Sequence, residues 1–169
     1  IVQCLHPISV MSRALQDLKK PTASRVPGLL HYIYTTLSVL EDDREECVQK
    51  LASALIHALK LRTQQYLTEP NNCLKAALVD PSQSRFLSSY GVSDEVIGMC
   101  WEKIIDECAD FHSSDDVPEG VNIRESCLPD VNNLRRYLSN CEVNNDDDVL
   151  VYYRDTQNVQ KWCHKAMPV

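Results

Sequence analysis

The sequence predicts an all-α fold, a multi-helix bundle of about six to eight helices with no significant sheet. Apolar residues recur at intervals of three and four along most of the 169 residues, which is the spacing of one face of a helix. Capping residues and prolines divide this pattern into segments. Only "VLVYY" (149–153) resembles a strand, and an isolated strand has no partner with which to form a sheet.

The first two helices are expected at 5–19 and from Thr22 to about Leu40. Pro7 falls in the first turn of the first segment, where proline is tolerated. Thr22 is the expected cap of the second helix, and Pro27 is expected to kink this helix or to delay its start. The apolar face of the first helix is predicted to carry Leu5, Ile8, Met11, Leu15 and Leu18.

The longest helix is predicted at about 44–68, with Asp43 as its cap and Glu46 in the capping-box position three residues later. A short helix at 71–79 is expected to end at Asp80, because a residue that precedes proline is pushed out of helical geometry. The stripe of the longest helix is predicted to contain Val48, Leu51, Ala52, Leu55, Leu59 and Tyr66.

A further helix is expected at 94–111, capped by Ser93 and with acidic residues placed favourably in its first turn. Trp101 and Ile104 lie on its apolar stripe and are predicted to be in the core. Two cysteines, Cys100 and Cys108, share this stripe and suit it, because free cysteine packs as a small hydrophobic residue.

Three parts make up the predicted organisation. Residues 1–111 form a helical bundle, 112–129 lack periodicity and are interpreted as a linker or mobile loop, and 130–169 form a second helical segment. Asp130 is the expected cap of a helix in this last part. One face of that helix is predicted to carry Val131, Leu134, Leu138 and Cys141.

The net charge of −7 makes this chain a poor candidate for a main DNA-binding surface. Proteins that bind duplex DNA concentrate lysine and arginine, because neutralisation of phosphates supplies most of the non-specific affinity. Here the basic residues form only isolated pairs, whereas acidic runs occupy 41–46 and 144–148. No apolar run approaches the roughly 20 residues of a membrane span, so no membrane partner is expected.

The eight cysteines allow two interpretations. An even number of cysteines is typical of a disulfide framework in a secreted protein. Several of these cysteines, however, occupy positions where a core residue is expected, which favours reduced and mostly buried thiols in an intracellular protein. The sequence contains no C-x-x-C pair and no zinc-finger spacing, so no metal site is predicted.

No catalytic or cofactor-binding motif is apparent. With four glycines, the chain offers no phosphate-binding loop, so no cofactor is expected. His57 is expected at the solvent edge of its helix or in a satisfied pair, and Cys163 and His164, being adjacent on a helix, cannot face each other as a nucleophile and its base. Asp80 could be a catalytic carboxylate, but we interpret it as a helix stop and a local hydrogen-bond acceptor.

Several segments, taken in order, resemble a known family. "LHPISVMSRALQDLKKPTASRVPGLLHYIYTTL" (5–37) is followed by "CLKAALVDPSQSRF" (73–86), "LRRYLSN" (134–140) and "DDDVLVYYRDTQNVQKWCHKAMPV" (146–169). The order is similar to that of hAT-family transposases after their second catalytic acid. Leu78, Asp80 and Pro81 match the family's "LDPR" motif, and Ser82 replaces its basic residue. Tyr152 and Tyr153 replace a tryptophan pair in the family's dimerisation region.

The resemblance implies a helical insertion domain at 1–111 and the start of the dimerisation region at 130–169. The family's Asp-Asp-Glu triad would lie outside this stretch, so the resemblance implies no enzymatic activity here. It implies a nuclear location and a role in oligomerisation or in contacts with other proteins, with DNA contacted through the parent protein. The departures at Ser82, Tyr152 and Tyr153 favour a domesticated relative that no longer transposes.

The predicted association residues are Tyr152, Tyr153 and Trp162, which lie in the segment 149–167. Aromatic side chains of this kind are enriched at interface hot spots. The same residues could instead pack back on the bundle, because aromatic residues at helical spacing are commonly core residues. Two other functions remain open at this point: a secreted, cytokine-like bundle with four disulfides, and a helical adaptor without transposon ancestry.

Overall fold

The computed structural model describes residues 1–16, 22–112, 131–136 and 138. Helices make up 79% of this part of the chain, which contains no strand. The predicted all-α class is therefore confirmed. The strand-like stretch 149–153 lies outside the described residues.

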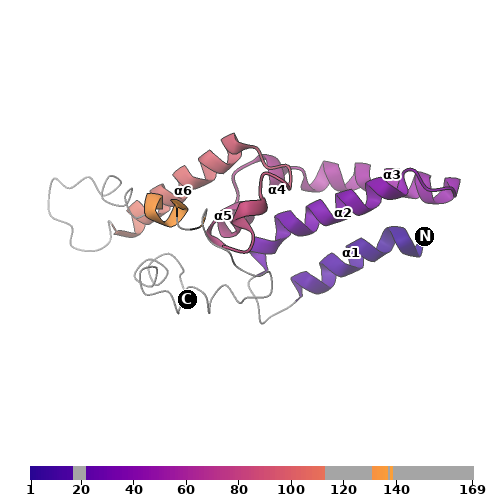
Figure 1. The fold of residues 1–169 in the computed structure, drawn as a ribbon, viewed down its shortest axis with the longest axis horizontal. Coiled ribbons are helices and arrows are strands. Elements are labelled where there is room, and N and C mark those ends of the chain that lie inside the picture. Colours follow the sequence, from indigo (N-terminus) through magenta and orange to yellow (C-terminus); the bar gives the residue numbers. More distant parts are fainter. Residues whose placement is uncertain (17–21, 113–130, 137, 139–169) are drawn as a thin grey trace.

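Three helices lie side by side in the N-terminal half (Figure 1). They are α1 (Val2–Leu15), α2 (Val26–Leu40) and α3 (Glu46–Thr63), and α2 packs against both of the others. Their shared core, called the bundle core below, is formed by aliphatic side chains with one alanine and one cysteine. Its buried members are Cys4, Ile33, Leu37, Val48, Ala52 and Ile56.

Helix α1 turns a different face inward from the one predicted. Its buried residues are Cys4 and Pro7, whereas Leu5 and Leu15 are exposed. The helix begins at Val2, so Pro7 lies in its second turn and not in its first. A proline there removes one backbone hydrogen bond, and its buried ring contributes to packing. Cys4, Pro7 and Met11 are spaced by three and four and form the inner face instead.

The start of α2 agrees with the prediction for Pro27 but not with that for Thr22. A short 3₁₀ turn, η1 (Ala23–Arg25), precedes the helix, and Thr22 makes no side-chain capping bond. Pro27 lies in the first turn of α2. Proline is favourable at this position because the N–H that it lacks would have no partner within the helix. The delayed start is therefore confirmed.

The predicted capping box of α3 is wrong. The Asp43 carboxylate accepts a hydrogen bond from the Glu45 N–H at 2.9 Å, and the helix begins only at Glu46. The Gln49 side chain donates to the Asp43 carbonyl at 2.7 Å and closes this turn. Asp43 therefore closes a turn in the loop, three residues before the first residue of the helix.

The single helix expected at 44–68 is divided in two. α3 ends at Thr63, and a short helix, α4 (Gln65–Thr68), follows. The Thr63 hydroxyl donates to the Leu59 carbonyl at 2.8 Å and lies 2.5 Å from the Tyr34 hydroxyl of α2. A threonine bonded back to the preceding turn favours bending of a helix, and the break directly follows Thr63. Tyr66, beyond it, is exposed and does not continue the predicted stripe.

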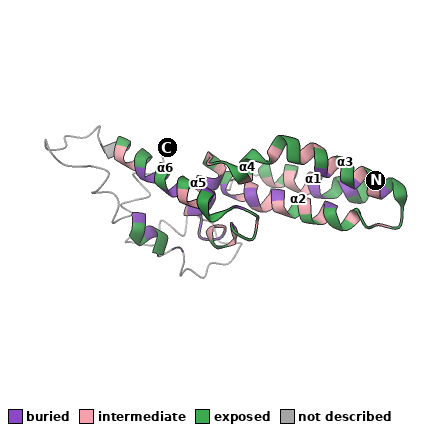
Figure 2. Ribbon diagram, turned by 90° about the horizontal axis from the view of Figure 1, so that it is seen from above, coloured by how far each residue is buried: buried purple, intermediate pink, exposed green. Residues whose placement is uncertain are grey.

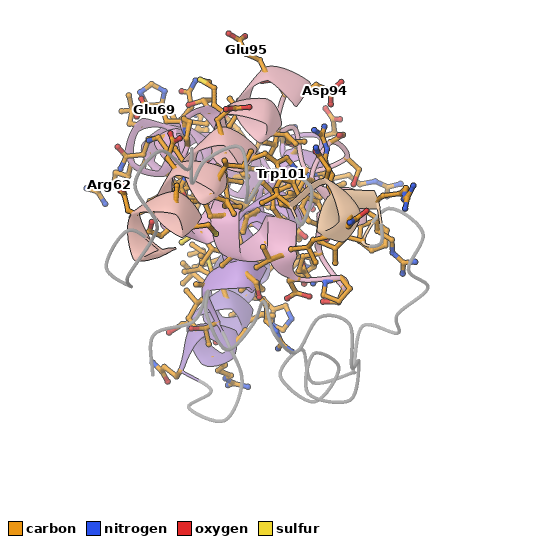
Figure 3. All side chains as sticks on the ribbon, turned by 90° about the vertical axis from the view of Figure 1, so that its left-hand side faces the viewer. Arg62, Glu69, Asp94, Glu95 and Trp101 are labelled. Carbon is orange, nitrogen blue, oxygen red and sulfur yellow. The ribbon has the colours of Figure 1, made fainter. Side chains whose placement is uncertain are left out.

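A second core lies between α5 (Asn72–Val79), α6 (Asp94–His112) and the helical residues 131–136 and 138. Trp101 and Ile104 are buried there, at 5% and 7% exposure, as predicted. Figure 3 shows Trp101 in the interior, with Asp94 and Glu95 at the periphery. The buried members of this second core are Leu74, Ala77, Leu78, Leu87, Val92, Val96, Cys100, Trp101, Ile104, Ile105, Val131, Leu134 and Leu138.

The described residues of the predicted segment 130–169 share this second core with α5 and α6 (Figure 2). Val131, Leu134 and Leu138 are buried, as their spacing predicts. Cys141 and Asp130 lie outside the described residues. Among the helices that the structure describes, none is both long and apolar enough to span a membrane.

Candidate functional site

The association residues predicted from the sequence lie outside the part of the chain that the structure describes. This holds for Tyr152, Tyr153 and Trp162. The candidate region that the structure does describe is the segment that follows α5, residues 80–93, together with the first turns of α2. It contains the Asp80-Pro81 pair of the sequence motif.

Asp80 is the last residue associated with α5, and its backbone has left helical geometry. Its side chain is 2% exposed. One carboxylate oxygen, Oδ1, accepts hydrogen bonds from the Ser82 N–H at 2.9 Å and from the Ser82 hydroxyl at 2.7 Å. The Asp80 carbonyl accepts from the N–H groups of Gln83 and Ser84. The interpretation of Asp80 as a helix stop and a local acceptor is confirmed.

Ser82 is a residue whose role the sequence interpretation missed. It is buried and donates both its N–H and its hydroxyl to Asp80. The sequence did carry a signal, because an aspartate two residues before a serine is a common Asx turn. The serine that departs from the family motif therefore has its own structural partner.

Four side chains form a continuous series of ring contacts from this segment to α2. The Arg85 guanidinium lies 4.7 Å from the centre of the Phe86 ring. The rings of Phe86 and Tyr90 are 6.2 Å apart, and those of Tyr90 and His31 are 5.3 Å apart. These separations suit tilted aromatic and cation–π contacts. The series joins α2 to the second core.

Gly28 permits this close contact. A Cβ atom at Gly28 would lie 3.2 Å from the Tyr90 ring and from the Gln83 side chain, which is tighter than an ordinary contact. Burial raises the pKa of Tyr90 above its usual value, and the negative charge of Asp80 acts in the same direction while Arg85 opposes it. Tyr90 therefore remains a neutral phenol at physiological pH. Its role here is packing.

Four of the described cysteines, Cys4, Cys47, Cys73 and Cys100, are free thiols. Burial raises the pKa of Cys73, and burial also raises that of Cys100, although the Asn71 backbone and two lysines oppose the second shift. A raised pKa disfavours the reactive thiolate. Cys47 is exposed on α3. Within the described residues, no group of His, Cys, Asp or Glu is placed to hold a metal ion.

The contacts of this region connect the segment after α5 with α2. The Asp80 carboxylate is buried and engaged by Ser82, and Tyr90 is held in the ring series. His57, a histidine considered from the sequence, is exposed on α3. Comparisons with protein-family models, with curated protein sequences and with solved structures each found no match.

Proposed function

We propose that this chain is a non-catalytic helical domain of a hAT transposase-like nuclear protein, and that it serves self-association and contacts with other proteins. The observation that carries the proposal is the state of Asp80. In the motif that resembles the family's "LDPR" element, Asp80 is buried. Its carboxylate accepts two hydrogen bonds from Ser82, and these bonds close the turn after α5.

The helical architecture of the described residues supports the same proposal. The resemblance implies a helical insertion domain, whereas the family's triad requires a sheet. The acidic composition supports a role in protein contacts over direct binding of duplex DNA. The free thiols of Cys4, Cys47, Cys73 and Cys100 also fit an intracellular protein better than a framework of four disulfides, which would use all eight cysteines.

Self-association is the property to measure first. Sedimentation equilibrium over a concentration series should show a dimer that dissociates at low concentration. The double substitution Tyr153→Ala/Trp162→Ala should weaken that dimer without lowering the melting temperature. Tyr66→Ala, at an exposed aromatic residue of α4, is the matched control and should leave association unchanged. A wild-type chain that stays monomeric at high micromolar concentration, with a double variant that loses stability, would contradict the proposal.

Two inexpensive assays separate the alternatives. Supercoiled plasmid incubated with the chain and Mg²⁺ or Mn²⁺ should remain intact, whereas nicking that is lost in Asp80→Ala would assign catalysis to Asp80. Thiol titration of the denatured, unreduced chain should find all eight thiols. A result of no free thiols would favour the secreted, disulfide-bonded bundle.

A further inference from the structure

Helix α2 presents an uncharged side to solvent. From Val26 to Leu40 its sequence contains no lysine, arginine, aspartate or glutamate. Tyr32, Thr35 and Val39 are exposed, and Val39 is 74% exposed. These three residues are spaced by three and four, so they lie along one side of the helix. We call them the open stripe of α2.

The open stripe can be removed from water at little cost. The Thr35 hydroxyl donates to the carbonyls of His31 and Tyr32 over 2.9 and 3.1 Å, so its hydrogen bond is already made within the helix. Val39 has no polar side-chain atom, and Tyr32 has a single hydroxyl. Burial of a polar group is costly when the group loses its hydrogen bond, and the Thr35 hydroxyl keeps its own. The stripe therefore suits packing against another helix.

Opposite charges lie at the two ends of the open stripe. Arg25 immediately precedes α2 with helical backbone geometry, seven residues or about two turns before Tyr32. Asp42 is exposed three residues after Val39, and the residue between α2 and Asp42 keeps helical backbone geometry. Within the part of the chain that the structure describes, neither charged side chain has an ion-pair partner. The stripe therefore runs from a positive to a negative end.

The same stripe on a second copy, running in the opposite direction, is its complement. Consider a two-fold axis that brings Tyr32 of each copy opposite Thr35 of the other. Arg25 lies seven residues before Tyr32, and Asp42 lies seven residues after Thr35. The same axis therefore brings Arg25 of each copy opposite Asp42 of the other, which forms two equivalent pairs of opposite charge. A parallel pair would instead place like charges together.

We propose that the open stripe of α2 is a self-association surface, on which two copies of this chain pack their α2 helices antiparallel. The inference rests on the proposed function, since it assigns a surface to the self-association proposed above. Val39 of the second copy falls opposite Gly28 and meets the Tyr90 ring that lies against that glycine. One pair of helices covers less than a standard interface of about 1,600 Å², so the dimer is expected to dissociate at micromolar concentrations.

Exchange of the two end charges tests both the pairing and its direction. In sedimentation equilibrium, Arg25→Glu should weaken the dimer about tenfold, because two pairs of opposite charge become pairs of like charge. Asp42→Arg should weaken it by a similar amount. The double variant Arg25→Glu/Asp42→Arg should associate like the wild type, because each pair again has opposite charges. A double variant as weak as the single ones would overturn the antiparallel pairing.

Two matched controls carry the same charge changes at other exposed residues. Arg62 and Glu69 lie outside α2, at the periphery of the molecule in Figure 3. Arg62→Glu and Glu69→Arg should leave the dimer nearly unchanged, because neither residue belongs to the open stripe. Equal weakening by the controls and by the Arg25 and Asp42 variants would mean that only net charge matters, and it would overturn the proposed surface.

The apolar contribution is tested at Val39. Val39→Ser should weaken association about tenfold and leave the melting temperature nearly unchanged, because the side chain is mostly exposed in the monomer. Leu61→Ser, at a residue of α3 that is 75% exposed, is the control and should leave association unchanged. A dimer that is weakened by Tyr153→Ala/Trp162→Ala but not by the α2 variants would overturn the proposed surface and leave the proposed function standing. Absence of a wild-type dimer at high micromolar concentration would overturn both.

Discussion

The two cores of this molecule are built in different ways. The bundle core joins three helices through aliphatic side chains and two small residues. The second core combines the long helix α6, which carries Trp101, with the short helix α5, the helical residues 131–136 and the segment that follows Asp80. A long helix presents a repeated apolar face, so packing of that face can fix its position with few polar contacts. The short α5, by contrast, has polar side chains at both ends: Asn71 accepts hydrogen bonds from the N–H groups of Cys73 and Leu74, and Asp80 accepts hydrogen bonds from Ser82.

The largest loss of stability is expected when the second core loses its aromatic centre. Trp101→Ala should cost about 3–5 kcal/mol of unfolding free energy, because a buried tryptophan leaves a large cavity. Urea denaturation followed by far-ultraviolet circular dichroism measures the loss without relying on tryptophan fluorescence. Tyr66→Ala, at an exposed aromatic residue, is the control. An unchanged midpoint for Trp101→Ala would mean that this core contributes little to stability.

The next largest loss of stability is expected at the turn after α5, where Asp80 accepts hydrogen bonds from Ser82. Asp80→Ala should cost about 2 kcal/mol, because it leaves the buried N–H and hydroxyl of Ser82 without their acceptor. Asp80→Asn keeps an acceptor oxygen and should cost less. Asp42→Ala, at an exposed aspartate, should have almost no effect. A double-mutant cycle with Ser82→Ala should give a clear coupling energy, and strict additivity would show that the two side chains act independently.

Features of the fold that depend on local sequence patterns could be predicted from the sequence. Within the described residues, the order of the helices, the cap at Ser93 and the burial of Trp101 follow from local patterns, and the structure agrees with them except that the helix expected at 44–68 is divided in two. The inner face of α1 did not follow, because two overlapping sets of apolar residues fit helical spacing. Packing against α2 and α3 selects the set with Cys4 and Pro7.

The candidate site was predictable only where it is local. The helix stop at Asp80 comes from a dipeptide, and the bond to Ser82 comes from a spacing of two residues. The contact between His31 and Tyr90 joins residues far apart in sequence. No local pattern states that α2 passes this segment closely enough for Gly28 to be needed. Such contacts depend on tertiary packing, which single-sequence patterns do not specify.

A smaller effect distinguishes the helix starts of the two cores. The Asn71 side chain accepts hydrogen bonds from the N–H groups of Cys73 and Leu74, at 2.9 and 3.1 Å. Asn71→Ala should therefore cost about 1 kcal/mol. Glu45, the N-cap of α3, makes no such bond and has an extended backbone. Glu45→Asn should stabilise the protein by about 0.5 kcal/mol. Thermal melts of both variants check the pair, and equal effects of the same sign would contradict the contrast.

The smallest effect is expected for the ion pairs, again with a difference between the two regions. Lys75 of α5 pairs with Glu107 of α6, and its side chain is only 15% exposed. Lys50 pairs with Glu46 over 2.6 Å within α3, where both side chains are at least 75% exposed. Exposed pairs one helical turn apart contribute about 0.3–0.5 kcal/mol and are screened by salt.

Lys50→Met should thus lower stability slightly in dilute buffer and not at all in about 1 M NaCl, where the screening length falls to about 3 Å. Lys75→Met should cost more, up to about 1 kcal/mol, and should keep part of its effect in salt, because the lysine is largely shielded from solvent although Glu107 is 61% exposed. Urea midpoints of the two variants at low and high salt make the comparison. If Lys50→Met proved the more costly, or if salt abolished both effects equally, the link between α5 and α6 would be no different from a surface pair.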